Sequence, residues 1–237
     1  MAYAPIYPHD PIEKIDDEVY MVRGSIKMNP VVRISRNMAI IRDGHDLTLI
    51  NPLRLDPAGE SQLEALGTVR RVLRTGAFHG LDDPYYIDRH DAEFWCQPGG
   101  ETYPLPSIDH EISAQSELPF PDADLFCFSA TKQPECIIRL KRSKTVLLTC
   151  DAIQHYGDYS NSNFVARAML PFIGFPKTTL IGPIWLKFMT PEGVSLKTEF
   201  ERLLEWDFEA LLSAHGTFRE SGAHAAVTAA LAVAFPD

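Results

Sequence analysis

The sequence predicts an α/β fold, and three stretches of similar design support this prediction. Each is a short apolar run, typical of a buried strand, that ends in a residue able to bind a metal ion. The three stretches are Val69–Leu73, which is followed by His79, Asp82 and Asp83; Lys144–Asp151, which ends on Asp151; and Phe208–Gly216, which contains His215. In open α/β sheets, ligands bind beyond the carboxyl ends of the strands. If the three strands are neighbours, their ends form one site, and the rest of the chain is scaffold and lid.

Upstream of the first of these strands, the sequence predicts a hairpin and a helix. Two apolar runs, Asn37–Arg42 and Asp46–Ile50, are separated by a glycine-containing linker, which is typical of an antiparallel hairpin. The segment Glu60–Leu66 places two leucines three residues apart, as on one face of a helix, and Gly67 follows as a suitable C-cap. The predicted order is therefore hairpin, helix and buried strand.

The remainder of the chain predicts a second antiparallel set of strands and several helices. Residues 100–123 are rich in proline, serine and acidic side chains, so we expect a long loop, which in a compact domain is often functional. The expected strands are Leu125–Phe128, Cys136–Leu140 and Val146–Thr149. The expected helices are a short one from Pro84, then Phe164–Ile173, Ser195–Trp206 and Gly222–Phe235, whereas Lys177–Met189 has no clear period.

Length, charge and cysteine content restrict the class of protein. The chain of 237 residues fits a single domain over residues 1–237, in which the proline-rich and acidic residues 1–17 are a surface arm. The formal net charge of −10, without a run of Lys or Arg, argues against nucleic acid or a membrane as the main partner, and favours a small-molecule substrate or ligand. The four cysteines form no CxxC pair, and no apolar stretch has the length of a membrane span, so we expect a cytoplasmic protein with reduced thiols. The sequence makes no prediction of oligomeric state.

The candidate site residues are His79, Asp82, Asp83, Asp151 and His215. Imidazole and carboxylate groups together suit zinc, iron or manganese. Such a metal lowers the pKa of a bound water to about 7, which supports hydrolysis at neutral pH. Each residue also has a plainer explanation, because a single histidine is more often structural and an aspartate often caps a following helix. Their occurrence at three strand ends favours a shared site.

The layout resembles the metallo-β-lactamase superfamily, and it is most similar to a divergent branch of that superfamily. The resemblance extends from Val19 to Phe235. It rests on the hairpin, on the helix and strand that lead to His79, on the strand that ends at Asp151, and on Ala214-His215-Gly216. It implies an αββα sandwich in which the site lies along one edge.

The first metal motif of this superfamily, His-x-His-x-Asp-His, falls here on residues 79–84. His79 and Asp83 match the first histidine and the aspartate of the motif, whereas Leu81 and Pro84 replace the second and third histidines. Neither replacement offers a side-chain donor atom for a metal ion.

Two later ligand positions are kept and one is lost. Asp151 matches the metal-bridging aspartate and His215 matches the last histidine, but no histidine occurs near Ser129–Thr131, where another ligand is expected. The resemblance therefore implies at most one metal ion per chain, held by His79, Asp83, Asp151 and His215.

These residues predict a metal-dependent hydrolase of the metallo-β-lactamase-like fold with a single Zn, Fe or Mn ion. In this interpretation Asp83, or Asp82 beside it, orients or deprotonates the attacking water. The alternative is a metal-free pseudo-enzyme that binds a small molecule or a partner protein in the same cleft. The lost imidazoles favour the alternative, and the retained Asp151 and His215 favour the hydrolase. Three further histidines, His90, His110 and His155, are candidates to replace the lost ligands, although nothing in the spacing requires it. His155 shares a helical face with Asp151 if Ala152 begins a helix, but the favoured interpretation is a loop residue near the mouth of the pocket.

Overall fold

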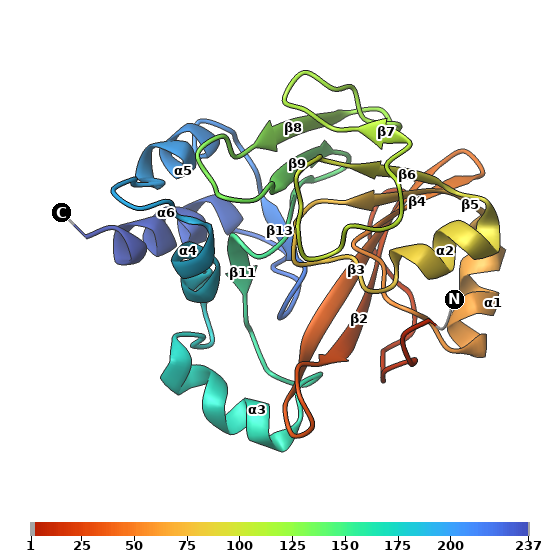
Figure 1. Cartoon of the computed structure of the whole chain (residues 1–237), viewed down its shortest axis with the longest axis horizontal. Coiled ribbons are helices and arrows are strands. Elements are labelled where there is room, and N and C mark those ends of the chain that lie inside the picture. The colour runs from red at the N-terminus through yellow and green to blue at the C-terminus, as the bar shows by residue number, and fades with distance from the viewer. Residues whose placement is uncertain (1–2, 237) are drawn as a thin grey trace.

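The computed structural model describes residues 3–236 and shows two β-sheets packed face to face, with helices on the outer side of each (Figure 1). The larger sheet has seven strands in sequence order: β1 (Glu13–Asp16), β2 (Val19–Lys27), β3 (Arg33–Asp43), β4 (Asp46–Ile50), β5 (Thr68–Arg74), β6 (Glu93–Cys96) and β7 (His110–Glu111). The smaller sheet has the order β13-β10-β9-β8, formed by β8 (Ala123–Cys127), β9 (Cys136–Lys141), β10 (Thr145–Thr149) and β13 (Ala210–Ser213). A separate pair consists of β11 (Ile153–His155) and β12 (Thr179–Ile181).

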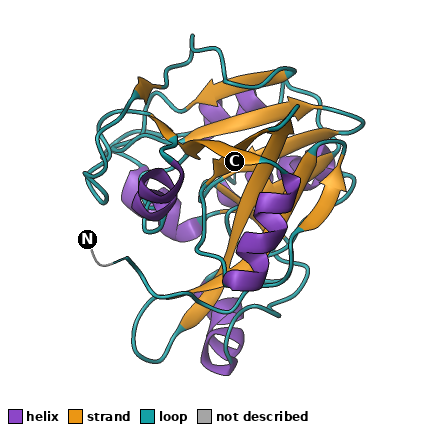
Figure 2. Ribbon diagram, turned by 90° about the vertical axis from the view of Figure 1, so that its right-hand side faces the viewer, coloured by secondary structure: helices purple, strands orange, loops and turns teal. Residues whose placement is uncertain are grey.

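The helices are α1 (Pro57–Leu66), α2 (Asp83–His90), α3 (Phe164–Met169) with the 3-10 helix η1 (Leu170–Ile173), α4 (Pro183–Met189), α5 (Lys197–Leu203) and α6 (Ala223–Ala234). Helices α1 and α2 cover the seven-stranded sheet, α4 to α6 cover the four-stranded sheet, and α3 with η1 lies at one end of the molecule (Figure 1). Figure 2 views the molecule from the side of α1 and α2, with these helices in front of the strands. None of the helices among residues 3–236 has the length and apolar character needed to cross a membrane.

Three apolar clusters correspond to the three interfaces between these layers. The central cluster joins the inner faces of the two sheets and includes Ile41, Leu73, Val146 and Leu212. A second cluster lies between the seven-stranded sheet and the helices α1 and α2, and a third lies between the four-stranded sheet and the helices α4 to α6. The predicted αββα sandwich is therefore present.

The predicted hairpin and the helix that follows it are present. Strands β3 and β4 pair in antiparallel register, with Asp43 opposite Asp46 across a turn in which Gly44 has a positive φ. The helix α1 begins after Asp56, whose side chain accepts a hydrogen bond from the backbone N–H of Gly59, and it ends at the predicted C-cap Gly67. Strand β5 then pairs parallel to β4. A parallel pair needs such a crossover helix, so the helix brings the chain back to the same edge of the sheet.

Two expectations need correction. Residues 13–16 of the expected surface arm form β1, an edge strand paired with β2, and Asp16 at its end is buried. Of the other arm residues, 3–12 are mainly exposed, and residues 1–2 lie outside the described part. No helix begins at Ala152, because residues 153–155 form the strand β11 against β12.

Candidate metal centre

Three of the predicted site residues meet at one edge of the sandwich. The Nε2 atoms of His79 and His215 are 3.2 Å apart, Asp151 Oδ1 lies 3.1 Å from His215 Nε2, and Asp151 Oδ2 lies 3.4 Å from His79 Nε2. The side chains are only 5, 13 and 11% exposed for His79, Asp151 and His215. Two nitrogen atoms and one carboxylate therefore face a common point that is nearly closed to solvent.

The strand register explains why Asp151 and His215 meet. Strands β10 and β13 are parallel neighbours, and Thr149 is paired with Ser213. Asp151 and His215 each lie two residues beyond this pair, so the two residues are side by side at the carboxyl ends of β10 and β13. His79 comes from the other sheet, five residues beyond the end of β5.

A hydrogen bond fixes the tautomer of His215. Its Nδ1 lies 2.6 Å from the backbone oxygen of Ser35 in β3, and because a carbonyl only accepts, Nδ1 must carry the proton. In a neutral ring the remaining nitrogen, Nε2, then presents a lone pair. That lone pair points at the carboxylate of Asp151, and two acceptors at this distance need a cation or a proton between them. A backbone carbonyl in this position is the usual outer partner of a metal-binding histidine.

His79 and Asp151 have strongly perturbed surroundings. Burial lowers the pKa of His79, which favours its neutral form. Burial alone would raise the pKa of Asp151, but a protonated His79 or His215 attracts this carboxylate and donates a hydrogen bond to it, which holds the pKa of the carboxyl well below its usual range. The Nδ1 atom of His79 is buried and has no hydrogen-bond partner among the described residues. The site thus holds an ionised carboxylate, which is the form that binds a metal, next to a histidine whose burial favours its neutral form.

The three side chains are close enough to share one ion. Bonds of about 2.0–2.1 Å in a tetrahedral zinc site separate neighbouring ligand atoms by about 3.3–3.4 Å. The two histidine nitrogens are 3.2 Å apart, and each faces a different oxygen of Asp151, at 3.1 Å for His215 and 3.4 Å for His79. Three protein ligands and one open position are also the usual number for a catalytic zinc ion.

Asp82 and Asp83 do not join this group. Asp83 is fully buried, and its Oδ2 accepts a hydrogen bond of 2.7 Å from Arg74 Nε. Asp82 is buried as well and accepts a hydrogen bond of 2.9 Å from Arg36 Nη1. Each carboxylate neutralises a buried guanidinium. The expected roles, Asp83 as a metal ligand and Asp83 or Asp82 as the general base, are therefore not supported by their contacts. The plainer expectation is also wrong in part, because Asp82 precedes α2 without a capping hydrogen bond from its side chain.

The two arginines were missed at the level of sequence. Arg36 lies within β3, two residues before the apolar core of the predicted hairpin, and Arg74 ends β5. Arg36 Nη2 also donates to the backbone oxygen of Pro52. A single arginine in a strand is usually solvated, so the sequence offered no signal that these two are buried beside Asp82 and Asp83.

Glu135 is a second residue that the sequence analysis did not select. It is buried, its Oε1 accepts a hydrogen bond from the backbone N–H of Ala152, and its Oε2 accepts one from Trp185 Nε1. Burial, and then the nearby charge of Asp151, raise the pKa of Glu135 well above its ordinary value. Glu135, Cys150 and Asp151 have potential ligand atoms within 4.8 Å of one another. Because both Glu135 oxygens already accept hydrogen bonds, we assign it to positioning the backbone next to Asp151.

The other histidine candidates lie elsewhere. His90 stacks on Tyr86, and His110 stacks on Trp95. His155 belongs to β11 and its Nδ1 lies 2.9 Å from Thr179 Oγ1. None of the three belongs to a group of potential metal ligands among the described residues.

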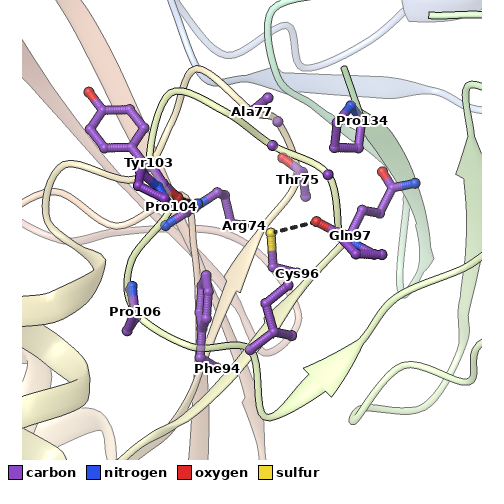
Figure 3. Close-up of a pocket in the computed structure, with 15 residues that line it drawn as sticks. Arg74, Thr75, Ala77, Phe94, Cys96, Gln97, Tyr103, Pro104, Pro106 and Pro134 are labelled. Carbon is purple, nitrogen blue, oxygen red and sulfur yellow. Dashed lines mark hydrogen bonds between the residues drawn. The ribbon is translucent and has the colours of Figure 1, made fainter. Parts of the chain in front are cut away.

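A small pocket lies beside the loop that leads to His79. Its volume is about 210 Å³, and Figure 3 shows Phe94, Tyr103 and the prolines around it. Gly76 and Ala77 form one wall, immediately before His79, and the Arg74 guanidinium lies 4.9 Å from the centre of the Phe94 ring. The predicted long loop supplies much of the lining. His79, Asp151 and His215 are not among the residues that line this pocket.

Comparison with known proteins identifies solved structures of similar architecture. No protein-family model matches the chain, and neither does any curated protein sequence. Several solved metallo-β-lactamases do match. The DIM-1 enzyme exposed to ceftazidime is 10% identical, with a TM-score of 0.66 over 98% of this chain and 100% of that one. The enzyme from Hirschia baltica is 13% identical, with a TM-score of 0.62 over 96% and 100%. FIM-1 from Pseudomonas aeruginosa in its mono-zinc form is 12% identical, with a TM-score of 0.63 over 98% and 99%. The chain therefore has the metallo-β-lactamase fold.

Proposed function

We propose that this protein is a metal-dependent hydrolase with a single metal ion held by His79, Asp151 and His215. The observation that carries the proposal is the lone pair of His215 Nε2, which the bond from Nδ1 to Ser35 directs at the carboxylate of Asp151. A bound Zn, Fe or Mn ion would supply a Lewis acid and a water of lowered pKa for the hydrolysis of an ester, amide or phosphoester. The mono-zinc form of FIM-1, which has the same fold, supports one ion as a workable number.

The residues of this chain would perform three tasks in such a reaction. His79, Asp151 and His215 would hold the ion. Ser35 keeps His215 in the tautomer that leaves Nε2 free, and Glu135 holds the backbone beside Asp151 through the N–H of Ala152. The near closure of the site limits access by water. The ion pairs of Asp82 and Asp83 take both carboxylates out of metal binding, which supports a single ion.

The proposal is tested by metal content and by thermal unfolding of protein purified without added metal or chelator. We expect close to one transition-metal ion per chain, and a melting temperature that falls on addition of a chelator. Binding to the folded state alone stabilises a protein by about 2.7 kcal/mol when the free ligand is at 100 times its Kd. The variants Asp151→Asn and His215→Gln keep the side-chain shape, and they should lose both the ion and the response to chelator.

Two matched variants control for the loss of a carboxylate or an imidazole as such. Asp46→Asn and His110→Gln alter the same residue types at partly exposed positions away from the site, and they should keep the ion. A wild-type melting curve that moves neither with chelator nor with added zinc, manganese or iron would refute the hydrolase proposal.

One observation favours the alternative of a metal-free binding protein. Protons on the Nε2 atoms of His79 and His215 would let both rings donate to Asp151 at hydrogen-bond distances without a metal ion. In that case His79→Gln should lower the free energy of unfolding only by the net contribution of a hydrogen bond, about 0.5–1.5 kcal/mol. Isothermal titration with zinc would then show no heat of binding in either protein.

A further inference from the structure

One end of the molecule exposes large apolar side chains that its fold does not require. Phe164 and Phe172 are 84 and 90% exposed. They lie on α3 and η1, which project away from the sandwich at the lower end of Figure 1, and α3 occupies the same end in Figure 2. The nearby turn between β2 and β3 exposes Met28 and Val31 by 60 and 63%. We call this surface the α3 face: Met28, Val31, Phe164, Val165, Phe172 and Ile173.

Hydrogen bonds join the two segments of the α3 face. The Asn163 amide nitrogen Nδ2 donates to the backbone oxygen of Val31 at 2.8 Å, and the backbone N–H of Asn163 donates to the oxygen of Arg33 at 2.9 Å. The apolar side chains of the turn and of α3 therefore belong to one continuous part of the surface.

The side of α3 and η1 that packs on the protein is already complete without these residues. Ala166 and Leu170 pack into a separate cluster with Tyr156, Phe175 and Leu180, all of which are buried. The exposed phenylalanines thus contribute little to folding, and their exposure calls for a binding role.

The two stretches of chain that contain the α3 face differ in charge from the whole protein, and the longer one is flanked by Asp158 and Glu192. Residues 27–33 and 159–191 contain no Asp or Glu, but they carry five basic residues: Lys27, Arg33, Arg167, Lys177 and Lys187. The rest of the chain then has 22 − 5 = 17 basic and 32 acidic residues, a balance of −15. Within residues 3–236, none of the five forms an ion pair with a carboxylate, and all but Arg33 are exposed.

From these observations we propose that the α3 face docks on a membrane surface with anionic head groups. Protruding phenylalanines in stretches with basic but no acidic residues suit an interface in which apolar side chains enter the acyl boundary and Lys and Arg meet the head groups. A bilayer accepts convex apolar protrusions without a matching pocket, whereas a protein partner would need a complementary hollow. The expectation of no membrane partner rested on the net charge, which averages over faces of opposite sign. This proposal does not depend on the metal centre.

The docking surface is connected to the candidate site. The backbone N–H of Ser35 donates to Ser162 Oγ at 3.2 Å, and the backbone oxygen of the same residue accepts the hydrogen bond from His215 Nδ1. Ser162 is two residues before Phe164 of the α3 face, and Ser35 links it to the proposed metal ligand His215.

Co-sedimentation of the full chain with vesicles tests the proposal. We expect binding to vesicles of equal parts phosphatidylcholine and phosphatidylglycerol, weaker binding to phosphatidylcholine alone, and a decrease with added salt. The double variant Phe164→Ser/Phe172→Ser should lower the partition coefficient at least about tenfold. Lys177→Glu/Lys187→Glu should reduce binding to the anionic vesicles only. Because all four side chains are exposed, the melting temperatures should stay near that of the wild type.

The control is Val233→Ser, which removes an 83% exposed apolar side chain from α6, and it should bind like the wild type. Equal losses for the control and the phenylalanine variant would overturn the proposal. Absence of the wild type from both vesicle pellets would also overturn it and would point to a protein as the occupant of this face.

Discussion

Arg74 and Asp83 form a buried ion pair beside the candidate metal centre. Asp83 has no exposed surface, and Arg74 also donates to the backbone oxygens of Tyr103 and Leu105. Removing one partner of a buried pair costs about 3–5 kcal/mol, because the other charge remains buried without compensation. We therefore expect Arg74→Met to lower the free energy of unfolding by an amount in this range, measured by urea denaturation.

The double variant Arg74→Met/Asp83→Leu distinguishes this cause from lost packing. Since it removes both charges, it should be less destabilised than Arg74→Met alone. The exposed pair of Lys14 and Asp17 is the control, and Lys14→Met should change stability by no more than about 1 kcal/mol. A double variant as unstable as the single one would contradict the role of the buried charge.

His90 gives a prediction for pH dependence away from the metal centre. Burial, and then the charge of Arg89, lower the pKa of His90, and its Nε2 has no partner among the described residues. The unfolded chain then binds a proton near the ordinary pKa of about 6.5, before the folded chain does. The contribution of His90 to stability is therefore fully present above about pH 6.5 and is lost as the pH falls through the folded pKa.

The variant His90→Phe keeps the stacking on Tyr86 and removes the titration. Its stability should fall less than that of the wild type between about pH 8 and pH 5, by urea denaturation at each pH. Parallel stability curves for the two proteins would show that His90 does not titrate differently in the folded state.

At the scale of elements, the loop after β13 depends on one glycine. Gly216 has φ +81°, and a Cβ there would lie 2.0 Å from the backbone oxygen of His155. A side chain at this position is therefore both strained and blocked by backbone. Gly216→Ala should displace the adjacent His215, so that metal content falls although His79, Asp151 and His215 are all kept.

The control for this variant is Gly100→Ala, where the nearest atom would be at 3.6 Å and φ is not positive. It should change the free energy of unfolding by no more than about 0.5 kcal/mol and leave the metal content as in the wild type. Full metal binding by Gly216→Ala would show that the loop tolerates a shift that we exclude.

The elements that could be predicted from sequence are those with a regular apolar pattern. The hairpin of β3 and β4, the helix α1 and the strand pair that carries Asp151 and His215 follow from periodicity and from glycine positions. The roles of Asp82 and Asp83 could not be predicted, because a carboxylate that binds a metal and one that binds a buried arginine look alike in sequence. Their arginine partners are 46 and 9 residues away, and only the folded chain brings them together.

At the scale of the whole molecule, the proposed ion would join the two sheets. His79 follows β5 of the seven-stranded sheet, whereas Asp151 and His215 follow β10 and β13 of the four-stranded sheet. We therefore expect zinc to slow amide hydrogen exchange in both sheets near residues 76–80, 150–152 and 214–217. The α3 face should exchange at the same rate with and without zinc. Protection limited to one sheet would contradict a bridging position.

The contacts of β3 with the segment after β13 also have a consequence for biosynthesis. The Asn37 side chain donates to the backbone oxygens of Ser213 and Gly216, and the Ser35 hydroxyl accepts from the N–H of Gly216, across about 180 positions of chain. Domains generally fold as units during synthesis. Ser35 and Asn37 in β3 therefore lack these partners until Ser213–Gly216 has emerged from the ribosomal exit tunnel. A nascent chain stalled before that point would also lack His215, so it could not assemble the proposed metal centre.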